Sequence, residues 1–248
     1  MQQVVAIIPA RLGSTRFPRK VLADQTGKPI IRHVWERAKQ AWSIRRVVIA
    51  ADDNEVVAAV RGFGGECLLT SPHHTNGTSR LAEAATQLGL PDDAIVVNVQ
   101  GDEPEVDPHV IDAAVAKLID SNAEVATVAS PFQPGEDPAN PNIVKAVVGS
   151  TGLALYFSRS RIPFHREGGS AESAPLKHVG LYVYRAGFLK TYAALPSTPL
   201  ERTEVLEQLR VLEHGYRIAV AICDVSSTGI DTPEQYAAFV ERMRTASR

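Results

Sequence analysis

The chain has 248 residues, of which 44% are hydrophobic and 22% charged, and its formal net charge at pH 7 is −2. This length can bury one sizeable α/β core, with or without a subdomain. The small net charge disfavours a nucleic-acid-binding surface, because a phosphate backbone is usually met by a clear excess of Lys and Arg.

The apolar runs are all far shorter than a membrane span, and the first residues lack the basic flank and cleavage site of a signal peptide. Cys67 and Cys223 stand outside any Cys-x-x-Cys spacing and lie in apolar runs. This usage indicates free thiols in a reducing compartment. We therefore expect a cytoplasmic protein that binds neither nucleic acid nor a membrane.

The first half of the chain alternates between strands and helices. Strands are predicted at residues 4–9, 47–51, 67–70 and 94–99, and helices at 30–41, 55–63, 81–88 and behind the N-cap signal Asp107-Pro108. Each strand is a nearly unbroken apolar run, which is typical of a parallel sheet covered by helices on both faces. The pattern predicts an α/β, Rossmann-like, doubly wound half.

The second half changes character at about residue 124. Strands are predicted at 125–129, 143–148, 154–157 and 179–184 with little helix between them, followed by a polar loop at 167–175, a helix at 200–214 and a strand at 218–225. The last helix begins with the capping box of Thr232 and Gln235. These elements predict a smaller mixed-sheet extension of the mostly parallel sheet.

A basic loop follows the first strand. It carries Arg11, Arg16, Arg19 and Lys20 together with Ser14 and a glycine. Ligands of open α/β sheets bind beyond the carboxyl ends of the strands, so the loop could hold a polyphosphate, or it could be a solvated basic surface. The spacing is not that of a P-loop, and no Gly-x-Gly-x-x-Gly follows a strand, which disfavours a nicotinamide oxidoreductase.

Acidic residues follow two other strands. Asp102 and Glu103 come after the strand at 94–99, and Asp231 comes after the last strand. Magnesium favours one or two carboxylates plus phosphate oxygens. Asp231 alone is better explained as a residue at the start of a helix than as a ligand, but its pairing with Asp102 beside a basic loop favours a metal site. A nucleotide-sensing or scaffolding protein would not need them together.

The strand near residue 180 has two unlike faces. Period-two alternation places Val179, Leu181 and Val183 on one face and His178, Gly180, Tyr182 and Tyr184 on the other. The first face is apolar and belongs in a core. The second is polar and aromatic and suits the wall of a ligand pocket, although a lone histidine on a strand is more often structural.

Five stretches of the chain, in order, resemble the 3-deoxy-manno-octulosonate cytidylyltransferase (CMP-Kdo synthetase) family. They are IPARLGSTRFPRKVL (8–22), HHTNGTSRLAE (73–83), VVNVQGDEP (96–104), HVGLYVYRAGFL (178–189) with PLERTEVLEQLRVLEHG (199–215), and GIDTPEQ (229–235). The resemblance implies an enzyme that transfers CMP from CTP to Kdo with release of pyrophosphate, on the route to lipopolysaccharide. It also implies a cytoplasmic homodimer with one nucleotidyltransferase domain over 1–248. In that domain 1–123 and 216–248 form the nucleotide-binding core, and 124–215 a sugar-binding and dimerisation extension.

The resemblance also assigns roles to residues. The nucleotide is expected at Ala10, Arg11, Ser14, Arg16, Lys20, Asn76, Gly77, Thr78 and Arg80. The sugar acid is expected at Gln100, Arg159, His178, Tyr182, Glu207 and Gln208. Asp102 and Asp231 are expected to hold Mg²⁺, and together with Lys20 and Arg16 they form the expected catalytic set.

Two positions depart from the family pattern. Ser79 stands where an acidic residue is usual, and Arg19 where glycine is usual. Ser79 could cap the following helix, while Arg19 could add a cation beside the phosphates or only decorate the loop. Ser79 keeps open a related sugar acid, 8-amino-Kdo or a sialic acid, as the substrate.

Overall fold

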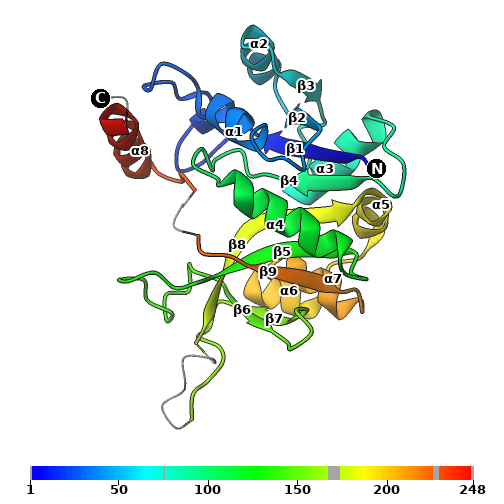
Figure 1. Cartoon of the computed structure of the whole chain (residues 1–248). Coiled ribbons are helices and arrows are strands. Elements are labelled where there is room, and N and C mark those ends of the chain that lie inside the picture. The colour runs from blue at the N-terminus through cyan, green and yellow to red at the C-terminus, as the bar shows by residue number, and fades with distance from the viewer. Residues whose placement is uncertain (1, 75, 167–173, 226–228, 247–248) are drawn as a thin grey trace.

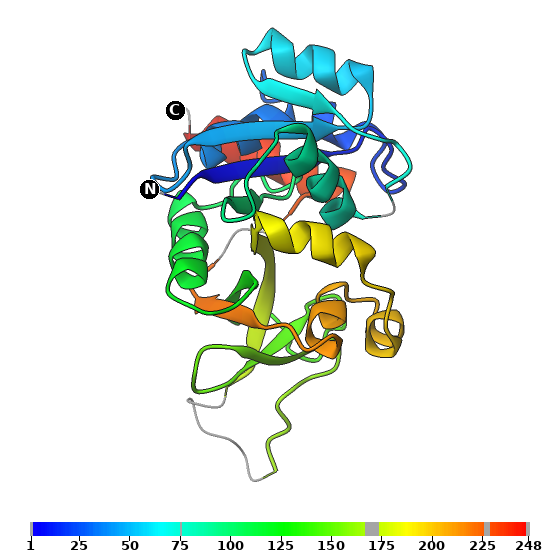
Figure 2. The same cartoon turned by 90° about the vertical axis from the view of Figure 1, so that its right-hand side faces the viewer.

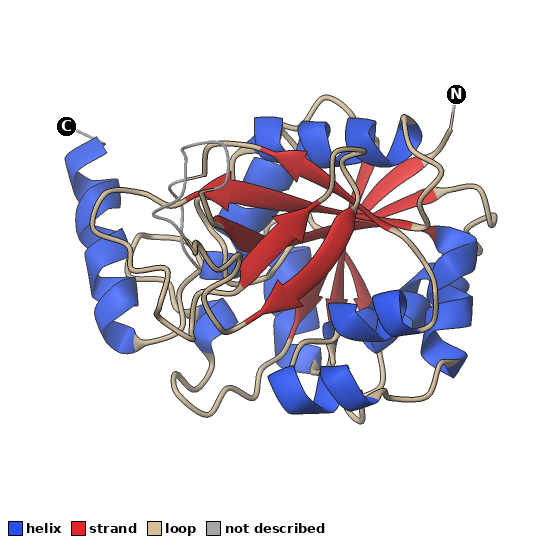
Figure 3. Cartoon of the chain, turned by 90° about the horizontal axis from the view of Figure 1, so that it is seen from below, coloured by secondary structure: helices blue, strands red, loops and turns tan. Residues whose placement is uncertain are grey.

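The computed structural model describes residues 2–74, 76–166, 174–225 and 229–246. The strands join into one sheet with the central order β3-β2-β1-β4-β8-β5-β9, and helices cover both of its faces (Figures 1 and 3). The strands are β1 (Val4–Ala10), β2 (Arg46–Ala51), β3 (Glu66–Leu69), β4 (Ile95–Asn98), β5 (Val125–Pro131), β6 (Lys145–Val148), β7 (Ala154–Ser158), β8 (Leu176–Arg185) and β9 (Ile218–Ile222). In that central order β8 alone runs against its neighbours, because it pairs antiparallel with β4 and β5 while the other pairs are parallel. The predicted fold class, a mostly parallel sheet with mixed strands, is confirmed.

The central strands are buried on both faces, as their unbroken apolar runs predict. In β1, Val4, Ala6 and Ile8 pack into one core, whereas Val5 and Ile7 pack into the other. The first core is covered by α1 (Ile30–Ala38), α2 (Asn54–Gly62), α4 (Pro108–Ile119) and α8 (Pro233–Ala246), and the second by α3 (Gly77–Gln87), α5 (Ala186–Ala194) and α7 (Gln208–Glu213). Figure 2 shows α3 and α5 lying side by side on the second face.

The helix predicted at 200–214 is in fact two short helices, α6 (Pro199–Glu204) and α7. The chain turns between them at Val205, which has the left-handed backbone angle φ 54°. This turn brings Leu206 into the second core and leaves the carboxylate of Glu207 facing a cavity. The sequence pattern does not predict α5, which begins directly after β8.

The strands assigned to the extension continue the main sheet. Only the hairpin of β6 and β7 leaves the central order, and it pairs with the first residues of β8. β9, from the C-terminal part of the chain, pairs with β5. The boundaries at 1–123, 124–215 and 216–248 stay a prediction, and most of the loop predicted at 167–175 lies outside the described residues.

Local signals at the helix starts are confirmed. Asp107 caps α4 by accepting a hydrogen bond from the His109 amide at 2.9 Å, with Pro108 in the first turn. Before α8, the Gln235 side chain accepts from the Thr232 amide at 3.1 Å, and Thr232 Oγ1 accepts from the Gln235 amide at 3.3 Å.

In the described part of the chain, no helix combines the length and apolarity needed to span a bilayer.

Candidate active site

Three loops meet at the carboxyl ends of β1 and β4 and at the start of α8. A Cβ atom on Gly101 would lie 2.6 Å from the carbonyl oxygen of Pro9, so only glycine lets these two loops approach so closely. The Ile230 amide donates to the carbonyl oxygen of Asp102 at 2.8 Å and joins the third loop to the second. Residues far apart in the chain are thereby held in one place.

The four residues expected to be catalytic lie together at this junction. Lys20, in the short 3-10 helix η1 (Lys20–Leu22), is buried, and its Nζ donates to Asp102 Oδ2 at 2.7 Å and to Asp231 Oδ1 at 3.2 Å. Arg16 is exposed and forms an ion pair with Asp231 Oδ2 at 3.0 Å. Lysine and arginine therefore neutralise the two carboxylates.

The two carboxylates suit a magnesium ion that is shared with a phosphate. Oxygen atoms of Asp102 and Asp231 converge on one nitrogen atom, that of Lys20, and carboxylate oxygens are ligands that Mg²⁺ prefers. Among the described residues, no three His, Cys, Asp or Glu side chains group into a metal site. A magnesium ion held here would thus depend on substrate oxygens for the rest of its coordination.

Glu103 is a third acid next to this pair. Burial, with a smaller effect from Asp102, raises the pKa of its carboxyl to about 7. Its side chain packs near Gly229, where a Cβ atom would lie 3.6 Å from Glu103 Cγ. The site therefore holds an acid that is partly protonated at neutral pH.

A cavity of about 260 Å³ opens beside Lys20 and the basic loop. It is lined by Pro9, Arg11, Gly13, Ser14, Lys20, Val21, Gly77, Gln100, Gly101 and Asp102. Of the residues expected to bind the nucleotide, Arg11, Ser14, Lys20 and Gly77 are in this wall. Ala10 is instead buried in the first core.

Arg80 lies behind the basic loop, not in the wall of this cavity. Its side chain is fully buried, with Nη1 donating to Thr70 Oγ1 at 2.6 Å and Nη2 lying 3.5 Å from Asp52 Oδ2. The other oxygen of Asp52 accepts from the Leu12 amide at 3.0 Å. Asp52 therefore ties the backbone of the basic loop to a buried cation. Its position directly after β2 is a signal that could have found it.

Arg19 is not among the residues that line the cavity. Its backbone is left-handed, with φ 59°, a conformation that glycine adopts more readily than other residues. Its guanidinium pairs with both carboxylate oxygens of Glu55 in α2, with Nη1 2.8 Å from Oε2. Arg19 is thus a surface ion-pair residue of the loop.

Ser79 does not cap α3. The cap is Asn76, whose Oδ1 accepts from the Ser79 amide at 2.8 Å, so Ser79 already lies in the first turn. Its hydroxyl contacts His74 Nδ1 at 3.0 Å, and the other ring nitrogen of His74 contacts Glu83. An acid one turn further along the helix therefore engages this histidine.

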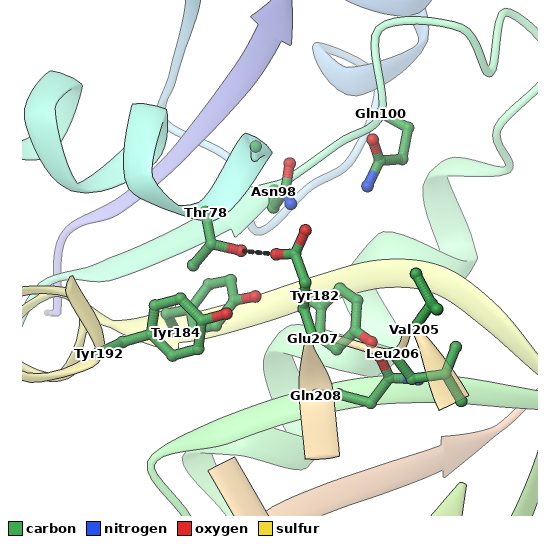
Figure 4. Close-up of a pocket in the computed structure, with 11 residues that line it drawn as sticks. Thr78, Asn98, Gln100, Tyr182, Tyr184, Tyr192, Val205, Leu206, Glu207 and Gln208 are labelled. Carbon is green, nitrogen blue, oxygen red and sulfur yellow. Dashed lines mark hydrogen bonds between the residues drawn. The ribbon is translucent and has the colours of Figure 1, made fainter. Parts of the chain in front are cut away.

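A second cavity, of about 290 Å³, adjoins the first and shares Gly77 and Gln100 with it (Figure 4). It is lined by Gly77, Thr78, Asn98, Gln100, Tyr182, Tyr184, Tyr192, Val205, Leu206, Glu207 and Gln208. Four of the six residues expected to bind the sugar acid are in this wall: Gln100, Tyr182, Glu207 and Gln208. Thr78 reaches Glu207 Oε2 at 3.4 Å, and burial raises the pKa of the Glu207 carboxyl.

The other two expected sugar-acid residues support the wall from behind. His178 contacts Thr127 Oγ1 at 2.9 Å and packs against the Tyr182 ring, with centroids 5.3 Å apart. Burial lowers the pKa of His178 to about 4, so the ring is neutral. Arg159 donates to the carbonyl oxygens of Glu204 at 2.7 Å and Val205 at 3.3 Å and so fixes the turn before Glu207.

Known proteins are similar to this chain in sequence and fold. A family model described as cytidylyltransferase matches residues 5–218. The 3-deoxy-manno-octulosonate cytidylyltransferase of Syntrophobacter fumaroxidans is 52% identical over 96% of both chains, and that of Geobacter sulfurreducens is 46% identical over 97% of this chain and 99% of its own. A solved structure of CMP:2-keto-3-deoxy-manno-octonic acid synthetase in complex with CTP is 40% identical, covers 99% of this chain and 100% of that one, and has a TM-score of 0.91. The chain therefore belongs to the 3-deoxy-manno-octulosonate cytidylyltransferase family and is a nucleotidyltransferase.

Proposed function

We propose that the protein transfers CMP from CTP to Kdo and releases pyrophosphate. The observation that carries this proposal is the pair of cavities that meet at Gly77 and Gln100, one beside the cationic loop and one with a polar, aromatic wall. Two substrates bound in these cavities would meet at the shared residues. The names of the relatives favour Kdo over 8-amino-Kdo or a sialic acid.

In the proposed reaction, the anomeric hydroxyl oxygen of Kdo attacks the α-phosphorus of CTP. One P–O bond forms, the bond to the β-phosphate breaks, the hydroxyl proton is released and pyrophosphate leaves. Arg11 and Ser14 hold the phosphates, while Lys20 and Arg16 offset the charge that grows on the leaving group. Catalysis then rests mainly on positioning and charge neutralisation.

Asp102 and Asp231 would hold Mg²⁺. The bound ion supplies positive charge against the phosphate oxygens. Lys20 donates to both carboxylates and so holds them close together.

The sugar acid is expected to contact Gln100, Tyr182, Glu207 and Gln208. His178 would act through Tyr182, and Arg159 through the turn at Val205. Truncating either supporting residue would thus loosen the wall without removing a direct contact to the substrate.

We further propose a cytoplasmic homodimer that serves lipopolysaccharide synthesis. Leu155 and Phe164 are large apolar side chains with 64% and 87% of their surface exposed. Exposed apolar surface of this kind often marks a protein interface, and a second copy would bury it. Light scattering of the wild type and of Phe164→Asp tests this: the wild type should be dimeric and the variant more dissociated, and a monomeric wild type would refute the dimer.

The reaction itself is tested by identifying its product. The purified protein, incubated with CTP, Kdo and Mg²⁺, should yield pyrophosphate and one phosphodiester with the mass of CMP-Kdo, seen by phosphorus NMR and mass spectrometry. ATP, GTP and UTP should give much less product. Absence of the phosphodiester with CTP would refute the proposed function.

A further inference from the structure

Two polar atoms in the wall of the second cavity are buried without a hydrogen-bond partner. They are Oδ1 of Asn98 and the hydroxyl oxygen of Tyr192, on residues that are 3% and 2% exposed. A buried polar group without a partner costs about 1–3 kcal/mol, and native proteins keep few of them. The expected substrate residues above do not include either side chain.

Both side chains are held rigidly by the protein. Asn98 ends β4, opposite Tyr182 in the β4–β8 ladder. Tyr192 lies in α5, packed between the Phe188 ring and the Arg210 guanidinium, which lies 4.9 Å from the Tyr192 ring centroid. Arg210 is in turn fixed to Glu201, with its Nε 2.9 Å from Oε2. The Tyr192 ring is therefore preorganised for a ligand, because these contacts restrict its rotamers before binding.

The position of Tyr192 indicates which part of a ligand it would meet. Figure 4 shows Tyr192 on the side of the cavity away from Gln100, where the cavity joins the phosphate-binding one. The reacting carbon of a sugar acid, with its carboxylate, must lie at that junction. The hydroxyl-bearing tail then extends toward Tyr192. Both polar groups are neutral, because an amide does not titrate and burial raises the pKa of the Tyr192 hydroxyl. Neutral groups suit hydroxyls better than a carboxylate.

We infer that Asn98 and Tyr192 are substrate-contacting specificity residues that hydrogen-bond hydroxyl groups on the tail of the sugar acid. The inference rests on the proposed function. Tyr192 donates its hydroxyl proton, and Oδ1 of Asn98 accepts one. A sugar acid that fills the cavity satisfies both atoms, which explains why the fold tolerates them unpaired.

The sharpest test is Tyr192→Phe, which removes one oxygen atom and keeps the rest of the ring. Thr78, the polar side chain within reach of that oxygen, donates its proton to Glu207 instead. We expect kcat/KM for Kdo to fall about tenfold, as for the loss of one hydrogen bond, with KM for CTP within about twofold of wild type. The melting temperature should be unchanged or higher. The matched control is Tyr216→Phe: Tyr216 packs on the same Phe188 ring but is not in the cavity wall, so its kinetics should not change.

The second residue is tested by Asn98→Leu, in which a side chain of similar shape lacks the amide. If Asn98→Leu does not fold, Asn98→Ala serves instead.

A Kdo analogue without the terminal hydroxyls tests whether the tail of the sugar acid is the contacted part. Wild type and Tyr192→Phe should turn over this analogue equally well.

Wild-type turnover with unchanged Kdo kinetics in both variants would overturn this inference and leave the proposed function standing. An altered KM for CTP alone would show that the cavity holds the nucleotide. A wild type that neither turns over nor binds Kdo by calorimetry would overturn both.

Discussion

The ammonium group of Lys20 lies 2.7 Å from Oδ2 of Asp102, although 82 positions separate the two residues in the chain. The same nitrogen atom bonds Asp231, so one cation joins the loops after β1 and β4 to the loop before α8. Without this cation the two carboxylates would repel each other, and a triphosphate would lose a counter-charge.

Lys20→Met should therefore impair the use of CTP more than that of the sugar acid. We expect kcat/KM for CTP to fall on the order of 100-fold, as when one charge-stabilising donor is removed from an active site. The Kd for Kdo, measured by calorimetry, should stay close to wild type. A change confined to the sugar acid would show that the basic loop does not hold phosphate.

Asp102→Asn and Asp231→Asn test the proposed metal site, because asparagine keeps the shape of the side chain and removes its charge. Each variant should bind Mn²⁺ in the presence of CTP at least about tenfold more weakly, seen by electron paramagnetic resonance, and should lose most turnover. Unfolding curves in the absence of metal control for the fold. Near-wild-type activity at limiting Mg²⁺ would rule out that residue as a ligand.

Arg19→Gly should leave catalysis intact, in contrast to Arg16→Ala. Arg19 has a left-handed backbone, which costs a non-glycine residue roughly 1–2 kcal/mol, and its ion pair with Glu55 is exposed and worth less than about 1 kcal/mol. The relieved strain is offset by the lost ion pair together with the entropic cost of ordering glycine, roughly 0.5–1 kcal/mol, so the free energy of unfolding should change by no more than about 1 kcal/mol. A large rise in KM for CTP in Arg19→Gly would place Arg19 among the phosphate ligands after all.

Asp52 supports the basic loop, and two substitutions separate its two contacts. Asp52→Ala loses both the hydrogen bond to the Leu12 amide and the counter-charge to buried Arg80, and should cost about 3 kcal/mol of stability. Asp52→Asn keeps an acceptor for the amide, so it should destabilise the fold but retain most of the affinity for CTP. Equal KM values for CTP in the two variants would contradict a positioning role.

The pH dependence of stability should reflect Glu103. Its pKa is about 7 in the fold and 4.5 ordinarily, so the unfolded carboxyl releases its proton first as the pH rises. The stabilisation from Glu103 is fully present below pH 4.5 and is lost toward pH 7. Relative to wild type, Glu103→Gln should thus gain about 1–3 kcal/mol between these pH values in urea unfolding without metal.

His178 provides a control, because its contribution to stability should change with pH in the opposite direction to that of Glu103. Its pKa falls from 6.5 to about 4 on folding, so its contribution is present above pH 6.5 and is lost as the pH falls toward 4. His178→Gln should therefore gain stability relative to wild type on acidification. A flat difference between Glu103→Gln and wild type from pH 4.5 to 7 would show that Glu103 titrates normally.

The sequence predicts the parallel core well, because buried strands such as β1 are continuous apolar runs with a clear period. It does not predict that β8 runs antiparallel between β4 and β5, since pairing depends on contacts between distant segments. The sequence also does not predict that the helix is interrupted at Val205, because a continuous helical pattern extends across this residue. Only the tertiary packing of Leu206 shows why the helix divides there.

The sequence motifs predict the site residues that they contain. They do not predict roles that depend on how a side chain is buried in the fold. The resemblance names Lys20 and Asp102, which do lie together. Asn98 is in a matching stretch, yet nothing in its spacing indicates that its amide lacks a partner. Conversely, His178 is named from the motif, whereas the fold places it behind Tyr182.

The central claim is tested most directly by competition among sugar acids. Pyrophosphate release should be followed with CTP and Mg²⁺, and kcat/KM compared for Kdo, 8-amino-Kdo and N-acetylneuraminate. We predict the highest kcat/KM for Kdo, with N-acetylneuraminate the poorer substrate by about tenfold or more, since each unpaired polar group in the cavity costs on the order of 1–3 kcal/mol. No release with Kdo, together with robust release with 8-amino-Kdo or N-acetylneuraminate, would contradict the named substrate.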